Sequence, residues 1–214
     1  MLEGIDRVSK YLNSEGYLKL LKKNYSNPNK VQKTRLRNIE RVPIYDSDDI
    51  NGGAYYSKQH PDNPENRIEL PKYGNKDIVE HEFLHAATDG QYGMSSLERE
   101  RISKRLKPDS NRSHYIEAGL TPYYERPEEF QARLGVTRML LQENGLYDFN
   151  KEEFTKEHLD KLKSSMKNNP DRWNIQGLYD VLDMSKSDED LIWLMNNIAA
   201  NTKSNKAKTR TYLT

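Results

Sequence analysis

The sequence predicts an α+β protein, because helical and extended patterns occupy separate parts of the chain. Apolar residues recur at helical spacing before residue 41 and after residue 75, and three short β-like runs lie between. The length of 214 residues suits one domain with a small appendage at most. With 34% hydrophobic and 31% charged residues, this domain must have a core that is thin for its size.

Composition excludes several classes of protein. No segment approaches the ~18 consecutive apolar residues of a membrane span, so we expect no membrane contact. The chain has no cysteine, which excludes a disulfide scaffold, a cysteine-ligated zinc ribbon and a thiol enzyme. The first residues show neither the apolar region nor the small-residue cleavage site of a secretory signal.

The first part of the chain contains two helical patterns and the β-like runs. Residues 2–23 have apolar side chains at three- and four-residue spacing, and Gly16 is expected to break this helix in two. A turn at Asn27-Pro28-Asn29 precedes a basic helix near residues 30–40. The β-like runs are residues 42–44, 53–56 and 67–70, separated by clusters of Asp, Asn, Gly and Pro.

Helices dominate the rest of the sequence. Residues 75–89 form a predicted helix that Gly90 closes, and residues 95–107 form a charged one. Pro127 opens a helix that ends near Glu143, with Gly145 just beyond. Three further helices are predicted over residues 155–166, 175–182 and 187–200, the last with Ser187 and Asp190 in a pattern that resembles a capping box.

Basic side chains are concentrated in two segments, although the net charge is only +1. Residues 19–41 carry eight basic side chains and one acid, and residues 203–210 carry four basic side chains and no acid. Such segments are typical of contacts with nucleic acid or with an acidic partner. A solvated helix face and a frayed terminus are the alternative explanation.

The most informative segment is His81-Glu82-Phe83-Leu84-His85, on the predicted helix 75–89. The four-residue spacing places both imidazoles on one helix face, about one turn apart, which suits two ligands of a tetrahedral Zn²⁺. Glu82 follows the first ligand, so its carboxylate can reach metal-activated water and accept a proton. Apolar residues around the motif are expected to bury the opposite face.

With this motif the sequence resembles the zincin metallopeptidases, and the resemblance covers about residues 53–140. The resemblance implies a zincin-like core with a short twisted sheet over an active-site helix, flanked here by N- and C-terminal helices. It also implies that an edge strand of the sheet binds an extended substrate by β-augmentation. Residues 66–70 are the candidate for this strand, and an ordinary strand of the core is the alternative.

Zincin families differ in their third zinc ligand. The metzincin pattern fails, because its ligand position is Gln91 and its glycine position is Thr88. The other common choice is a Glu on a later helix, as in gluzincins. Glu129 is our candidate, since it shares a helix face with apolar residues, where an unpaired carboxylate would be costly. Glu128 is the alternative ligand, and acids in a first helical turn also suit the helix dipole without any metal.

Two further roles are assigned to single residues. The gluzincin pattern has an acid four residues past its ligand Glu, and this chain has Arg133 there. Asp89, one turn past His85, is therefore our candidate for orienting that histidine. Stabilisation of the substrate oxyanion commonly uses Tyr or His, and Tyr124 is our candidate, with a packing role as its alternative.

A second resemblance concerns two other segments. Residues 17–23 (YLKLLKK) and 194–199 (LMNNIA) look like parts of metallopeptidase-like structural proteins of tailed bacteriophages. This resemblance implies virion proteins as partners, so we expect a cytoplasmic or virion-associated protein.

Together these features predict zinc-dependent hydrolysis of a peptide or protein substrate, with His81, His85 and Glu129 as ligands of Zn²⁺ and Glu82 as general base. The alternative is a phage virion structural or nucleic-acid-associated protein that binds nucleic acid through residues 19–41 and has a vestigial or stabilising metal site. The expected parts are a basic helical extension (1–40), a zincin-like core (41–145), a C-terminal helical part packed on it (146–200) and a flexible basic tail (201–214).

Overall fold

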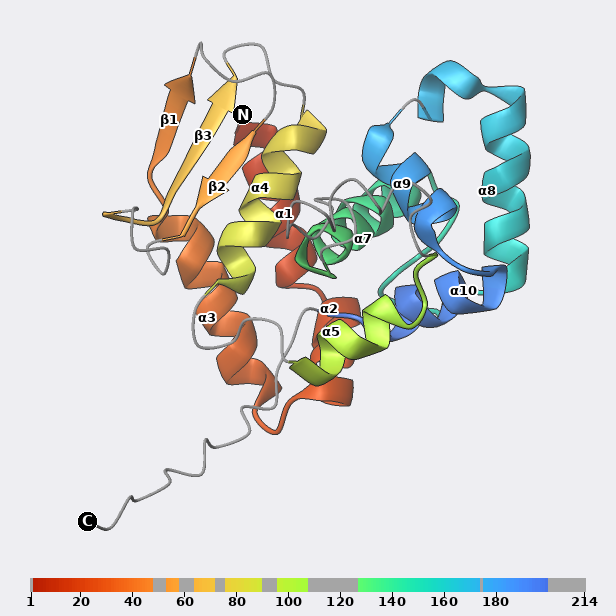
Figure 1. Ribbon diagram of the computed structural model, residues 1–214, viewed down its shortest axis with the longest axis horizontal. Coiled ribbons are helices and arrows are strands. Elements are labelled where there is room, and N and C mark those ends of the chain that lie inside the picture. Colours follow the sequence, from red (N-terminus) through yellow and green to blue (C-terminus); the bar gives the residue numbers. More distant parts are fainter. Residues whose placement is uncertain are drawn as a thin grey trace, which may run out of the picture.

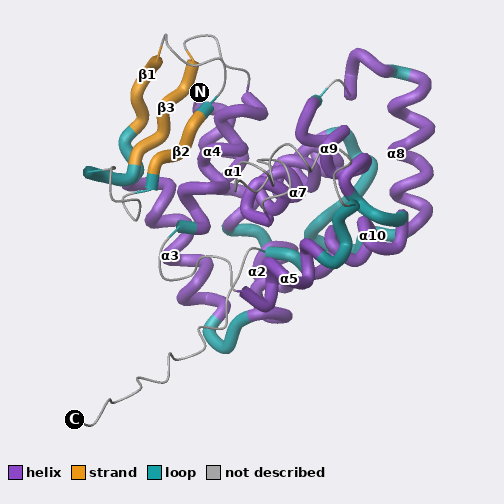
Figure 2. The backbone as a smooth tube through the Cα atoms, viewed as in Figure 1, coloured by secondary structure: helices purple, strands orange, loops and turns teal. Residues whose placement is uncertain are grey.

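A small sheet stands beside a larger array of helices, which confirms the α+β class (Figures 1 and 2). The computed structural model describes residues 2–47, 53–57, 64–71, 76–89, 96–107, 127–173 and 175–199. Its strands are β1 (Ile44–Ser47), β2 (Ala54–Tyr56) and β3 (Arg67–Pro71). The α-helices of these residues are α1 (Leu2–Leu12), α2 (Glu15–Asn24), α3 (Pro28–Arg41), α4 (Lys76–Thr88), α5 (Ser96–Ser103), α7 (Pro127–Glu143), α8 (Lys156–Asn168), α9 (Gln176–Met184) and α10 (Asp188–Asn197). None of them is both long and apolar enough to cross a membrane.

The break between α1 and α2 falls at Ser14, and its prediction at Gly16 is wrong. The Ser14 side chain caps α2 by accepting a hydrogen bond of 3.1 Å from the Tyr17 backbone N–H. Gly16 lies inside α2, where a Cβ would stand 2.2 Å from the carbonyl oxygen of Phe149. This glycine therefore permits close packing and does not end a helix.

Other helices begin close to their predicted signals, although α3 starts at Pro28, inside the turn predicted for residues 27–29. Asn27 caps α3 by accepting a hydrogen bond from the Lys30 backbone N–H, and Pro28 occupies the first turn. Ser187 caps α10 in the same way, with the Asp190 N–H as donor. Gly145 follows α7 with a φ of +68°, a backbone conformation that is energetically unfavourable for residues other than glycine.

The sheet is mixed, with the strand order β1-β3-β2. β1 runs parallel to β3, and β2 runs antiparallel to it. The prediction that residues 66–70 bind a substrate strand is therefore wrong, because β3 is the central strand and pairs on both sides. Of the described strands, β1 and β2 form the two edges.

The sheet packs against α4, which also contacts α1, α3 and α7 (Figure 1). On the sheet side, the buried residues Ile68 and Leu70 of β3 belong to the hydrophobic core. On another side of α4, the carboxylate of Glu80 is completely buried and lies 2.8 Å from the guanidinium of Arg7 on α1. Arg7 also lies 3.0 Å from Glu143 on α7. The guanidinium of Arg7 on α1 thus forms ion pairs with both α4 and α7.

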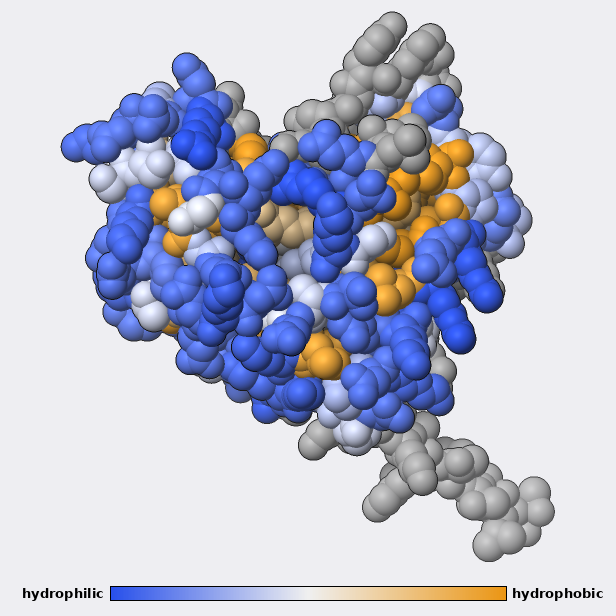
Figure 3. Space-filling view, turned by 180° about the vertical axis from the view of Figure 1, so that it is seen from behind, coloured by the Kyte–Doolittle hydropathy of each residue, from blue (hydrophilic) through white to orange (hydrophobic). Residues whose placement is uncertain are grey.

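Buried arginines supplement the apolar core. Arg138 of α7 is 1% exposed and donates hydrogen bonds to the carbonyls of Met195 and Ile198, at 2.7 and 2.8 Å. Arg35 of α3 is 0% exposed and donates to the Tyr25 hydroxyl at 2.7 Å and to the Ala199 carbonyl. Both guanidiniums bind the chain around the end of α10. The face shown in Figure 3 is mostly hydrophilic, with hydrophobic residues in separate areas, as the composition requires.

Candidate metal centre

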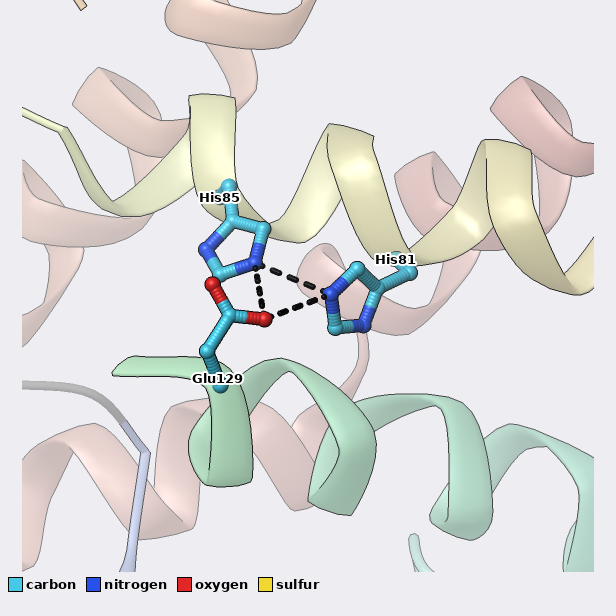
Figure 4. A group of neighbouring side chains, drawn as sticks. All are labelled: His81, His85 and Glu129. Atoms are coloured by element: carbon cyan, nitrogen blue, oxygen red, sulfur yellow. Dashed lines mark hydrogen bonds and ion pairs between the residues drawn. The ribbon is translucent and has the colours of Figure 1, made fainter. Parts of the chain in front are cut away.

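Helix α4 presents His81 and His85 on one face. Its other faces bury Val79, Phe83 and Leu84, each at most 3% exposed, so burial of these side chains fixes the rotation of the helix. Both imidazole rings point away from α4 toward the start of α7, as Figure 4 shows. Their side chains are only 15% and 13% exposed. The predicted pair therefore lies in a largely enclosed position between two helices.

Glu129 of α7 completes a group of three. It stands in the first turn of that helix, which Pro127 opens, and its side chain is 10% exposed. Its Oε2 atom lies 3.1 Å from Nε2 of His81 and 3.3 Å from Nε2 of His85, and the two Nε2 atoms are 3.0 Å apart (Figure 4). Within the described residues this is the one group of three that can hold a metal ion.

The spacing of the donor atoms fits a small cation. In a tetrahedral Zn²⁺ site with bonds of ~2.0–2.1 Å, neighbouring ligand atoms stand ~3.3 Å apart. The three observed separations, 3.0 to 3.3 Å, lie at or just below this value. Two imidazole nitrogens and a carboxylate oxygen are ligands that divalent transition metals accept. The side chains present therefore fit a metal ion.

Burial and mutual contacts set the charges of the three residues. Burial lowers the pKa of His81 to about 4, although the hydrogen bond with Glu129 acts in the opposite direction. For His85, burial also disfavours the charged form, but the hydrogen bond with Glu129 and the nearby acids outweigh it and raise the pKa. Burial alone would raise the pKa of Glu129, yet its hydrogen bonds with both histidines hold it well below the usual range. Glu129 is thus ionised and His81 neutral at pH 7, the forms that bind metal.

Glu82 lies on the side of α4 that faces β2. It is 4% exposed, and burial raises its pKa to about 7, although the charge of His85 and a hydrogen bond from the Tyr55 backbone N–H lower it. A Cβ on Gly53 would stand 2.6 Å from Cγ of Glu82. The backbone of residues 53–55 thus closes over the Glu82 side chain and holds its carboxylate beside His85.

Asp89 connects the end of α4 to β2. Its Oδ2 atom accepts hydrogen bonds from the Tyr55 hydroxyl at 2.7 Å and from the Ser57 hydroxyl at 3.0 Å. Asn38 of α3 donates to the Asp89 and Ala87 carbonyls, at 3.2 Å each. That Asp89 orients His85 stays a prediction. Its partners on β2 were not foreseen, because no local pattern links residues 55 and 89.

Arg133 stands where the gluzincin pattern has an acid, one turn past Glu129. Its guanidinium forms a nearly buried ion pair of 2.7 Å with Asp180 of α9. Its charge contributes to disfavouring the protonated forms of His81 and His85. The sequence alone gave no signal for Asp180, which belongs to a helix far along the chain.

Some predictions fall on positions about which the structure says nothing. Tyr124, Gly90 and the basic tail 201–214 lie outside the described residues, and the side chain of Glu128 is not described. The role of Tyr124 as oxyanion donor and the choice between Glu128 and Glu129 as ligand therefore stay predictions, although Glu129 is the acid that reaches the two histidines.

Comparison of the chain with protein-family models, with curated proteins and with solved structures finds no match. The fold and the site define an α+β protein with a candidate His/His/Glu metal centre. The spacing of His81 and His85 in this centre is that of an HExxH motif.

Proposed function

We propose that this protein is a zinc-dependent peptide hydrolase. The observation that carries the proposal is the convergence of His81, His85 and Glu129 within 3.3 Å, with the buried carboxylate of Glu82 beside them. Two histidines and one glutamate are the ligand set of a well-known class of catalytic zinc sites. Structural zinc sites are closed by four protein ligands, whereas this group offers three in the described part of the chain. With these three ligands, a fourth position would hold water or substrate.

The residues around the site have distinct tasks in this proposal. His81, His85 and Glu129 would hold Zn²⁺, which when bound polarises a carbonyl and brings the pKa of water toward ~7. The Glu82 carboxylate accepts a proton from water as the oxygen attacks the peptide carbonyl, and it then delivers that proton to the leaving amine. A buried carboxylate beside His85 suits both transfers, since the base must accept and release the proton within one turnover.

In this proposal an extended peptide substrate lies along the edge strand β2. It pairs with β3 on one side, and on its other side the Tyr55 N–H reaches Glu82 of α4. The side of β2 that faces away from β3 therefore borders the candidate base. A peptide laid along this edge would bring a backbone carbonyl next to the metal centre by β-augmentation, the role that the resemblance to zincins implied for residues 66–70.

A comparison of metal content and cleavage tests the proposal. The protein should bind about one zinc ion per chain and cleave members of a mixed peptide library. Glu82→Gln should keep the metal and lose cleavage by at least ~10²–10⁴-fold, as expected for loss of a general base. Glu157→Gln, an exposed change on α8, serves as the matched control and should leave both unchanged. Zinc binding without cleavage by the native protein would favour a stabilising metal instead, and unchanged cleavage by Glu82→Gln would refute the assigned base.

A further inference from the structure

A basic groove runs along α3 next to the candidate site. Two cavities of about 590 and 360 Å³ lie against this helix and share Thr34 and Arg37 in their walls. The side chains of Lys30, Lys33, Arg37 and Arg41 follow one another at intervals of three or four residues, so they lie on one helix face. All four are exposed, and none forms an ion pair within the described residues.

The larger cavity is bordered by elements that also carry the candidate site. Its wall includes Tyr55 of β2 and Ala86 of α4, the residue that follows His85. The backbone N–H of Tyr55 donates to Glu82, while its hydroxyl donates to Asp89. Asn38 of α3, also in the wall, donates to the carbonyl at Asp89. Tyr55 therefore contributes both to the wall of the groove and to a hydrogen bond with the candidate base.

We propose that this groove binds an acidic segment of the peptide substrate, flanking the bond that is cleaved. This inference rests on the proposed function, since it assigns a substrate class to the same site. From Lys30 to Arg41 the helix extends ~16 Å, the length of about five residues of extended peptide. Successive basic side chains are ~4.5–6 Å apart along the helix, comparable with the ~6.6 Å between alternate residues of a strand. An extended peptide with Asp or Glu at alternate positions thus matches the cations.

The groove suits an acidic peptide better than a nucleic acid. The wall of the larger cavity also includes Glu65, whose carboxylate accepts a hydrogen bond from Tyr45 and interrupts the row of cations. Nucleic acid has a charge on every phosphate, whereas a peptide can place an uncharged residue beside Glu65. Among the described wall residues of both cavities, Tyr55 is the one aromatic residue, and its hydroxyl is engaged with Asp89. The described residues therefore do not supply the row of aromatic rings on which single-stranded nucleic acid stacks its bases.

Paired peptides test the inference on the full-length, zinc-loaded protein. The two peptides of a pair have the same sequence around the cleaved bond. They differ only at alternate positions on one side of that bond, where one peptide has Asp and the other has Asn. One pair varies the N-terminal side, and a second pair varies the C-terminal side. We expect kcat/KM to be about tenfold higher for one of the acidic peptides, equivalent to about 1.4 kcal/mol. This preference should fall as salt rises, because exposed ion pairs are screened. Cleavage of both members of each pair at equal rates would overturn the inference while leaving the proposed function intact.

Variants assign the preference to α3. In Arg37→Gln/Arg41→Gln the ratio of the two kcat/KM values should fall toward one. Lys161→Gln/Lys167→Gln, which removes the same charge from exposed positions on α8, should retain the ratio. A ratio that persists in the α3 variant would overturn the assignment. The two changes on α3 are at exposed side chains, and an unchanged Tm would show that the variant is folded.

Binding separates failure of the inference from failure of the proposed function. A fluorescently labelled acidic peptide should bind with an affinity that drops in the α3 variant, measured by anisotropy. If this result is obtained but no peptide is cleaved, the proposed function fails and the groove remains a site for acidic peptides. If a single-stranded oligonucleotide binds more tightly than the peptide through the same arginines, the groove is a phosphate site and the inference is wrong.

Discussion

Removal of the Arg7 guanidinium tests how α4 is held in place. Arg7→Met leaves an apolar side chain of similar length but takes away the partner, 2.8 Å distant, of the fully buried Glu80 carboxylate. It also removes the 3.0 Å contact with Glu143. Loss of one member of a buried ion pair costs about 3–5 kcal/mol, because the remaining charge stays desolvated. For a chain of this size the Tm should fall by roughly 6–20 °C, at 2–4 °C for each kcal/mol.

The double variant Arg7→Met/Glu80→Gln separates charge from packing. It also neutralises the buried Glu80 side chain that has lost its contact with Arg7, so most of the lost stability should return, measured by urea unfolding with zinc present at a fixed concentration. Glu143→Gln is the matched single change, and we expect a loss below ~1 kcal/mol, since that carboxylate is 43% exposed. A loss in Arg7→Met no larger than that in Glu143→Gln would refute the view that a buried pair holds this helix.

Three further outcomes are expected. First, Glu129→Ala should lower zinc affinity by more than ~100-fold, beyond the ~10–100-fold typical of groups that only support a ligand. The affinity is measured by competition with a zinc indicator. An equal loss of zinc affinity in Glu128→Ala would contradict the choice of Glu129. Second, zinc binding at pH 6 should release about one to two protons, because the raised pKa values of Glu82 and His85 leave both protonated there and the cation expels these protons. The affinity for zinc should therefore rise with pH. Calorimetric heats of zinc binding that do not depend on the buffer would argue against this proton release. Third, Gly53→Ala should reduce kcat/KM, since the new Cβ would lie 2.6 Å from Cγ of Glu82. Gly145→Ala, with no atom within 4 Å of its Cβ, should cost ~1–2 kcal/mol of stability through its φ of +68° and leave kcat/KM unchanged.

The features that the sequence predicted depend on local spacing. His81 and His85 share a helix face because of a fixed periodicity, and burial of the neighbouring apolar residues then decides which way that face turns. Glu129 was found by the same reasoning, as an acid on the apolar side of a helix, and it does reach both histidines. Their role as zinc ligands remains a proposal.

The features that the sequence did not predict depend on which segments meet in space. Strand order is one, since three short runs do not reveal that the last of them, β3, lies in the centre. The partners of Glu80 and Arg133 are others, because Arg7 and Asp180 lie on helices far from them in the chain. Ser14 was overlooked for a different reason: it caps a helix next to a glycine, and the glycine gave the more familiar signal.

The buried guanidiniums of Arg35 and Arg138 have a consequence for the response of this protein to temperature. The heat capacity of unfolding rises with the apolar surface that becomes exposed and falls with the polar surface. A core in which two arginines and their carbonyl partners replace part of the hydrocarbon should therefore have a smaller heat-capacity change than most chains of 214 residues. Its free energy of unfolding then changes less with temperature. Cooling should therefore destabilise this fold less than it destabilises a protein whose core is more apolar.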